Sequence, residues 1–296
     1  MGSSSRRVAV VAPSSPFPRE DFDRGIEWLR ARAEVSDDDR WYGREGFLAG
    51  DDRARLASLL EALRDPRVRC IWSARGGYGA TRVLERAGDD LLAALTADPK
   101  PVVGYSDVTA LHALWARAGV RSVHGAMVTA LGRGDPHRDE LWAIIDGALP
   151  SPWEGLTAIH PGRAVEGIAL GGNLALIAAL AGTAWQFDLR GAVLMLEDIR
   201  EAPYRVDRML TTLRASGALR GVAAVVLGEF AGCEAGADGV TVEDVCRERL
   251  ADLGAPVLWN APFGHGARNR PWVSGARVAV DARRGLVRHL DGLCAR

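Results

Sequence analysis

Lysine is almost missing from this sequence of 296 residues. Lys100 is the only one, and arginine supplies the rest of the 37 basic residues. The 38 acidic residues bring the formal net charge to −1. A chain without excess positive charge has no overall electrostatic attraction for nucleic acid or for an anionic membrane surface. We therefore expect neither as a partner.

Cysteine and long apolar runs are scarce as well. The four cysteines contain no C-x-x-C pair, so their spacing fits neither a zinc site nor a disulfide framework; they are Cys70, Cys233, Cys246 and Cys294. No apolar run approaches the roughly 20 residues of a membrane span. The strand-like segment 8–12 follows the N-terminus too closely for a secretory signal. These features predict a cytoplasmic protein with reduced thiols.

The composition, with 48% hydrophobic and 25% charged residues, is typical of folded domains, and the length suggests two of them. In the first half, apolar runs alternate with amphipathic segments. The predicted strands are 8–12, 68–74 and 101–105, and the predicted helices are 22–33, 51–63, 81–87 and 107–118. This alternation predicts an open α/β sheet with parallel strands, which binds ligands at the carboxyl ends of its strands.

A stretch rich in Pro and Gly at 150–163 predicts a domain boundary. We expect an α/β domain over 1–150, a linker over 151–163 and a β-rich domain over 164–296. Within the last of these, the predicted strands are 165–170, 192–196 and 223–228, followed by a hairpin over 278–288; the predicted helices are 173–181, 204–216 and 242–253.

Ser106 falls between a predicted strand and a predicted helix. The first N–H groups of a helix lack internal partners, so a serine there could attack a carbonyl while the Asp107 N–H receives the oxyanion. Serine is also a preferred helix N-cap, and on local sequence alone the cap is the better interpretation. The pattern G-x-S-x-G is absent.

Three further features could take part in chemistry. Glu197 ends an apolar strand, and His265 lies in a loop between two glycines. The glycine pair in Arg75–Gly79 allows positive φ or close approach to a ligand, although a plain tight turn is the better interpretation of this loop by itself. A serine hydroxyl needs an imidazole to take its proton, and the imidazole needs a carboxylate to orient it. His124 is the alternative base; the remaining histidines are predicted at the surface or, for His112, within a helix. No His/Asp/Glu cluster has metal-ligand spacing, so no metal is expected.

Several segments, in order, resemble the LD-carboxypeptidase family of serine peptidases. They are VAVVAPSSP, LAGDDRARLASLLEALRDPRVRCIWSARGGYG, VVGYSDVTALHAL, VHGAM, LGGNLALIAALAGT, LEDIREAPYRVDRMLTTL and FGHGARN. Together these segments span nearly the whole chain. The resemblance implies a flavodoxin-like N-terminal domain and a smaller β-rich C-terminal domain.

The resemblance also implies roles for individual residues. Ser106 would be the nucleophile, His265 the general base and Glu197 the residue that orients it, with the N–H groups of Gly77 and Asp107 as oxyanion donors. It implies no metal or organic cofactor, a homodimer, and hydrolysis of the bond to the terminal D-alanine of cytoplasmic murein tetrapeptides.

Alternatives stay open at this point. One branch of the family cleaves peptidyl-nucleotide antibiotics of the microcin C type. The same cleft could bind a cell-wall peptide without cleaving it, or the 75–79 loop could bind a nucleotide. An arginine near the site could bind the carboxylate at the end of the substrate by a fork of hydrogen bonds, and Arg75, Arg205 and Arg268 are the candidates.

Overall fold

The computed structural model describes residues 7–293 and divides into two compact units, Met1–Asp139 and Glu140–Arg296. The chain passes from the first unit to the second within helix α6 (Arg138–Ile145). The segment 151–163, expected as a linker, belongs to the second unit and contains strand β6 (Thr157–His160). The domain boundaries given from the sequence remain a prediction.

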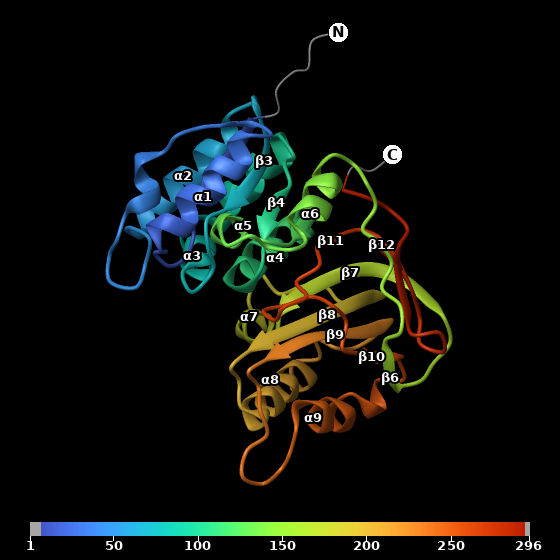
Figure 1. Cartoon of the computed structure of the whole chain (residues 1–296). Coiled ribbons are helices and arrows are strands. Elements are labelled where there is room, and N and C mark those ends of the chain that lie inside the picture. The colour runs from blue at the N-terminus through green and yellow to red at the C-terminus, as the bar shows by residue number, and fades with distance from the viewer. Residues whose placement is uncertain (1–6, 294–296) are drawn as a thin grey trace. The chain divides into compact units, whose positions relative to one another are not determined.

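The N-terminal unit is built on a parallel sheet with the strand order β2-β1-β3-β4-β5 (Figure 1). These strands are β1 (Arg7–Val11), β2 (Glu34–Val35), β3 (Val68–Ser73), β4 (Val102–Gly104) and β5 (Ser122–His124). The order is that of flavodoxin-like folds, which confirms the predicted fold class. Loops after β1, β3 and β4 therefore meet at one edge of the sheet, and Ser106 lies in the last of them.

The helices of this unit are close to those predicted. They are α1 (Arg19–Arg30), α2 (Asp52–Arg64), α3 (Ala80–Ala97), α4 (Thr109–Arg117) and α5 (Val128–Gly132), with the short 3-10 helices η1 (Asp39–Tyr42) and η2 (Ser106–Val108). Helix α3 runs ten residues beyond its expected end at Ala87. The backbone kinks at Ala87, where φ is −154°, and the helix then resumes because Leu91 and Leu95 pack into the core.

The C-terminal unit contains a mixed sheet in the order β13-β12-β7-β8-β9-β10-β6. Strands β7 to β10 pair in parallel. At one edge β6 pairs antiparallel with β10, and at the other β12 pairs antiparallel with both β7 and β13. Besides β6, the strands are β7 (Val165–Asn173), β8 (Ala192–Ile199), β9 (Ala224–Ala231), β10 (Val257–Trp259), β12 (Arg277–Asp281) and β13 (Leu286–His289), with β11 (Trp272–Ser274) preceding β12 in the chain. The predicted β-rich character of the C-terminal half is confirmed.

The remaining helices connect the parallel strands of this second sheet. They are α7 (Leu174–Leu180), α8 (Pro203–Ala215) and α9 (Val242–Arg249), followed by the short η3 (Ala251–Leu253). Pro203 begins α8, at a position where a missing N–H does no harm. Residues of both faces of the sheet are buried along β8, so its last residues emerge from a rigid core.

The single lysine has a structural role. Lys100 is 1% exposed, and its Nζ donates to the carbonyl oxygen of Leu63 and to Asp98 Oδ2 at 2.6 Å. The Lys100 carbonyl accepts from the indole of Trp115 at 2.6 Å. The buried ammonium group is thus paired and hydrogen-bonded, as a buried charge must be.

Candidate active site

The backbone at Ser106 has φ +63°, a left-handed conformation that is unusual for a residue with a side chain. Ser106 is therefore not the helix N-cap that its local sequence favours: an N-cap has extended backbone, and in η2 that residue is Tyr105. A Cβ on Gly76 would lie 2.9 Å from the Ser106 Cβ, so only glycine fits opposite the serine. Non-glycine residues in this conformation cluster at functional sites, where surrounding structure holds them in place.

The glycine loop after β3 is bent in the way its sequence predicts. Gly77 has φ +111° and Gly79 has φ +140°. A Cβ on Gly77 would lie 2.4 Å from the hydroxyl oxygen of Ser15, so a larger residue is excluded by space as well as by conformation. The Ser15 hydroxyl accepts from Tyr78 N at 3.1 Å, and Ser15 N donates to the Gly76 carbonyl at 3.3 Å. The loop after β1 thereby fixes the glycine loop.

Asp107 joins the same three loops through its carboxylate. The group is buried, and its Oδ2 accepts from the Ser14 hydroxyl at 2.6 Å and from Ala80 N at 2.8 Å. Burial raises the pKa of Asp107, and the two hydrogen bonds oppose that rise. The carboxylate thus connects the loops after β1, β3 and β4, while the backbone of Asp107 directly follows Ser106.

In the C-terminal unit, His265 and Glu197 form a close pair. His265 Nδ1 lies 2.6 Å from Glu197 Oε2, and the Glu197 side chain has no exposed surface. Burial by itself would lower the pKa of His265, but the charge and hydrogen bond of Glu197 outweigh it, and the pKa is raised. Because Nδ1 donates to the carboxylate, Nε2 is the nitrogen that can accept a proton.

Glycine and asparagine residues hold the histidine loop against the end of β8. Gly264 has φ +126°, and a Cβ there would lie 3.0 Å from the Glu197 Cβ. Its N–H donates to Asn269 Oδ1 at 3.2 Å. The conformation and the close contact both require glycine, which explains one of the two glycines that flank His265.

A second carboxylate, Asp198, follows Glu197 in the chain and is buried as well. Its oxygens accept from Asn173 Nδ2 and Ala175 N, both at 2.9 Å, and from Ile199 N at 2.8 Å. Burial, together with the charge of Glu197, raises the pKa of Asp198 to about 6. Asn173 also caps α7, since its Oδ1 accepts from Leu176 N. The sequence reasoning assigned no role to either residue, although Asn ahead of an apolar helix is an N-cap signal.

Among the other histidines, one lies in a different place from the one predicted. His289 was expected at the surface, but it is 4% exposed and its Nε2 accepts from Val273 N, because β13 turns this side chain into the core. His112 is also buried, between Ser122 Oγ at 2.8 Å and the Gly104 carbonyl at 2.9 Å. His124, the alternative base, has no exposed surface. Its ring is therefore less accessible to a substrate than that of His265.

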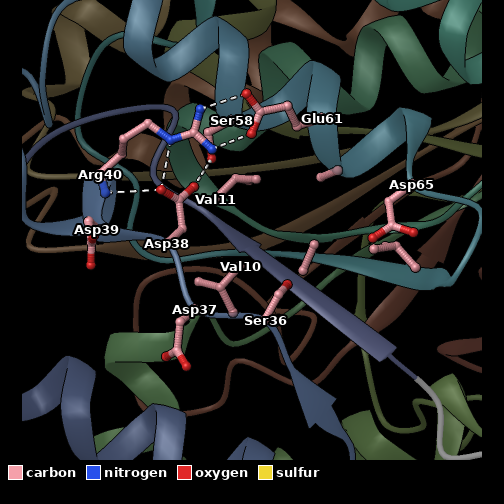
Figure 2. A pocket seen from close by; sticks show the side chains of 13 residues that line it. Val10, Val11, Ser36, Asp37, Asp38, Asp39, Arg40, Ser58, Glu61 and Asp65 are labelled. Carbon is pink, nitrogen blue, oxygen red and sulfur yellow. Dashed lines mark hydrogen bonds and ion pairs between the residues drawn. The ribbon is translucent and has the colours of Figure 1, made fainter.

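A hollow of about 440 Å³ opens beside β1 and α2 in the N-terminal unit, and it contains none of the predicted site residues. Figure 2 shows Arg40 between Asp38 and Glu61 at its wall. Arg40 Nε donates to Asp38 at 2.7 Å, and its Nη1 donates to Glu61 at 2.9 Å. The charges that line this hollow are largely paired with each other, and we assign no chemistry to it.

Within residues 7–293, no group of three or more His, Cys, Asp or Glu side chains is arranged to hold a metal ion. Cys70, Cys233 and Cys246 are free thiols, and Cys294 lies outside the described residues. In the same range, no helix combines the length and the apolar character needed to cross a membrane.

The structure thus places the predicted residues in two groups. Gly77, Ser106 and Asp107 lie at the strand ends of the N-terminal unit, and Glu197 and His265 are in contact in the C-terminal unit. The first group contains a serine with left-handed backbone next to a glycine loop, and the second contains an imidazole that is hydrogen-bonded to a buried carboxylate.

Comparison with known families identifies the chain. The model of the LD-carboxypeptidase N-terminal domain matches residues 8–125, and that of the LD-carboxypeptidase C-terminal domain matches residues 166–280. The chain belongs to the LD-carboxypeptidase family, a family of peptidases.

Individual relatives agree with this assignment. The murein tetrapeptide carboxypeptidase of Pseudomonas aeruginosa is 32% identical over 294 residues, which cover 94% of each chain. The muramoyltetrapeptide carboxypeptidase of Oxalobacter formigenes has a solved structure that matches with a TM-score of 0.81 at 33% identity, over 95% of this chain and 98% of that one.

A more distant relative shares the fold. The structure of the microcin immunity protein MccF in complex with glutamyl sulfamoyl guanosine matches with a TM-score of 0.83, over 99% of this chain and 98% of that one. The identity is 22%, so this likeness shows the fold alone.

Proposed function

We propose that this protein is a serine carboxypeptidase that hydrolyses the L,D-peptide bond to the terminal D-alanine of murein tetrapeptides. The observation that carries the proposal is the contact of 2.6 Å between His265 and the buried Glu197, which is the geometry of a general base with its orienting carboxylate. The murein peptide substrate comes from the names of relatives at 32% and 33% identity.

Ser106 is the proposed nucleophile. Its hydroxyl attacks the carbonyl of the L-residue and transfers its proton to His265 Nε2, and His265 then protonates the nitrogen of the leaving D-alanine. Water attacks the resulting acyl-enzyme with His265 again as base. Glu197 accepts from Nδ1 throughout and stabilises the imidazolium that forms in each half of the reaction.

The backbone N–H groups of Gly77 and Asp107 are the proposed oxyanion donors. The left-handed conformation of Ser106 and the bend at Gly77 support this assignment, because both are fixed by contacts before any substrate binds. Donors fixed in advance need no reorganisation as charge develops, and a single one contributes roughly 10²–10³-fold to the rate. The Asp107 carboxylate accepts hydrogen bonds from Ser14 and Ala80, and we propose that it fixes the positions of the two donor loops relative to each other.

The products of the reaction test the proposal. The purified chain is incubated with a murein tetrapeptide ending in D-alanine or L-alanine, and the products are identified by mass spectrometry. We expect alanine release from the D-form only, and no release by Ser106→Ala. Hydrolysis by Ser106→Ala at the wild-type rate would refute the serine mechanism, and binding without hydrolysis by the wild type would indicate a non-enzymatic peptide receptor.

The relationship to the microcin immunity protein gives a second substrate to test, an aminoacyl sulfamoyl nucleoside. We favour the murein peptide because the murein enzymes are 32–33% identical to this chain, against 25% for the Escherichia coli immunity protein. We further propose that the protein acts in the cytoplasm as a homodimer. Sedimentation equilibrium of the full chain tests the oligomeric state, and cell fractionation tests the location.

A further inference from the structure

The C-terminal unit contains a second hollow of about 440 Å³ next to the histidine loop. The ends of β9 and β10, the start of α9 and the loop after His265 surround it; Figure 1 shows these elements. Its lining includes Glu229, Phe230, Thr241, Trp259, Asn260 and Arg268. Gly266, the residue directly after His265, also lines it. The hollow therefore reaches the residue next to the proposed general base.

Arg268 is held firmly in the wall of this hollow. Its Nε donates to Glu229 Oε1 at 2.7 Å, and its Nη2 donates to Asn260 Oδ1 at 2.5 Å. Glu229 also approaches Gly266 so closely that a Cβ there would lie 2.0 Å from Oε2. A larger residue next to His265 would thus displace the carboxylate that orients Arg268.

Asn260, the residue that tethers this arginine, has φ +67°, a left-handed conformation that asparagine adopts more readily than most residues. An arginine has five N–H hydrogens, and within residues 7–293 the two side-chain bonds use two of them. Three N–H hydrogens stay available on a guanidinium group whose position is fixed. A group of this kind can bind a carboxylate through two parallel hydrogen bonds with little loss of side-chain freedom.

The rest of the lining suits the remainder of a peptide. The rings of Phe230 and Trp259 stack with centroids 5.6 Å apart and planes 7° apart, which gives the hollow an apolar wall. The acidic Glu243 at the start of α9 is paired with Arg247 at 2.7 Å, so it does not turn the hollow into a cation site. The hollow thus combines an apolar wall with one oriented arginine.

We infer that this hollow is a subsite for the peptide substrate. In it, Arg268 binds a carboxylate of the substrate, and the rings of Phe230 and Trp259 contact the apolar atoms of the substrate next to that carboxylate. The inference rests on the proposed function, which supplies a peptide acid as substrate. The residues that flank the scissile bond offer two carboxylates: the one at the C-terminus, and the one on the side chain of the third residue if that residue is diaminopimelate rather than lysine. Both present the same chemistry to Arg268.

Binding constants distinguish the two sources. Dissociation constants are measured by calorimetry for three tetrapeptides on the Ser106→Ala chain, with and without Arg268→Gln. The peptides carry diaminopimelate with a free C-terminus, lysine with a free C-terminus, and diaminopimelate with a C-terminal amide. Loss of two charge-assisted bonds should weaken binding about 10- to 100-fold. An effect confined to the free C-terminal acids identifies the terminal carboxylate, and one confined to the diaminopimelate peptides identifies the side chain.

Kinetics on the otherwise wild-type chain separates this role from support of the histidine loop. Arg268→Gln should raise KM and leave kcat within about threefold. Arg277→Gln is the matched control, because Arg277 is an exposed, ion-paired arginine of the same unit and lies outside the hollow. Unchanged dissociation constants, or an equal loss for all three peptides, would overturn the inference. Failure of the wild type to release alanine from any peptide would instead refute the proposed function.

A second variant keeps the inference testable if Arg268→Gln does not fold. Asn260→Gly removes the tether of Arg268 and suits the positive φ at this position, so the fold should be kept. It should weaken binding of the same peptides as Arg268→Gln, by a smaller factor. Unchanged binding to Asn260→Gly would count against the role of the tethered arginine.

Discussion

Glu197 Oε2 lies 2.6 Å from Nδ1 of His265, although 68 residues separate the two in the chain. The carboxylate is at the end of the buried strand β8, and the histidine loop is fixed against it by Gly264 and Asn269. The pair is therefore set by the fold of the C-terminal unit alone, before a substrate or the serine is considered.

Glu197→Gln should change both the rate and the pH dependence of hydrolysis. A general base must be neutral, so kcat/KM falls as pH drops below the pKa of His265, which Glu197 raises. Without that charge the acid limb should move to lower pH, while the plateau falls by roughly 10²–10⁴-fold because the imidazole loses its orientation and its charge partner. The pH profile of kcat/KM measures both effects. Asp188→Asn, at an exposed ion pair of the same unit, is the control.

Ser106→Gly and Ser106→Ala should both be inactive and yet differ in stability. At φ +63° an alanine keeps the left-handed strain, whereas a glycine does not. The glycine variant should be more stable than the alanine variant by about 1 kcal/mol, measured by urea unfolding. An alanine variant that is as stable as the glycine variant would mean that this backbone is not strained.

Gly77→Ala should slow hydrolysis by roughly 10²-fold or more, because a Cβ collides with the Ser15 hydroxyl and displaces the proposed oxyanion donor. Gly119→Ala is the matched control, since Gly119 also has positive φ, +69°, but has open space around its Cβ position. That variant should lose about 1 kcal/mol of stability and keep its activity. Equal kcat values for the two variants would contradict the proposed role of Gly77 as an oxyanion donor.

Acid should destabilise both units through buried histidines. Burial lowers the pKa of His112, in the first unit, and of His289, in the second, to about 4. The unfolded chain binds these protons near pH 6.5, so stability is fully present above that pH and is lost as the pH falls toward 4. The loss should be about 2 kcal/mol for each histidine between pH 7 and pH 5.

Proton NMR titration of the two histidine rings checks the cause of this loss, and urea unfolding at the two pH values checks its size. A ring that titrates near its usual pKa would contradict the prediction for that histidine. His265 should behave oppositely in the same spectra, since its pKa is raised.

Much of the fold was predictable from local patterns. The acidic residues at 51 and 52 predict the start of helix 51–63, and the structure has α2 at Asp52–Arg64, with the Asp51 side chain accepting from Ala54 N. The hairpin 278–288 and the parallel α/β class of the first half were also predicted correctly. Local patterns work here because hydrophobic periodicity and capping depend on residues that are close in the chain.

Other features could not be read in the same way. Helix α3 continues beyond the kink at Ala87 because Leu91 and Leu95 are buried. The burial of His289 follows only from the pairing of β13 with β12, which local sequence does not reveal. The roles of Asp198 and Asn173 also depend on a tertiary contact, because adjacent parallel strands bring their ends together.

By itself, the sequence determined the α/β class, the family and the residue types available for catalysis. Tertiary structure decided which of the conformations and contacts allowed by the local sequence each of these residues adopts. Ser106 is locally a helix cap, but the contacts of the loops after β1, β3 and β4 hold it in a left-handed conformation. Glu197 and His265 become a pair only when β8 and the histidine loop pack together. Local sequence sets the preferences of a few residues, and long-range packing, with its larger total energy, selects among them.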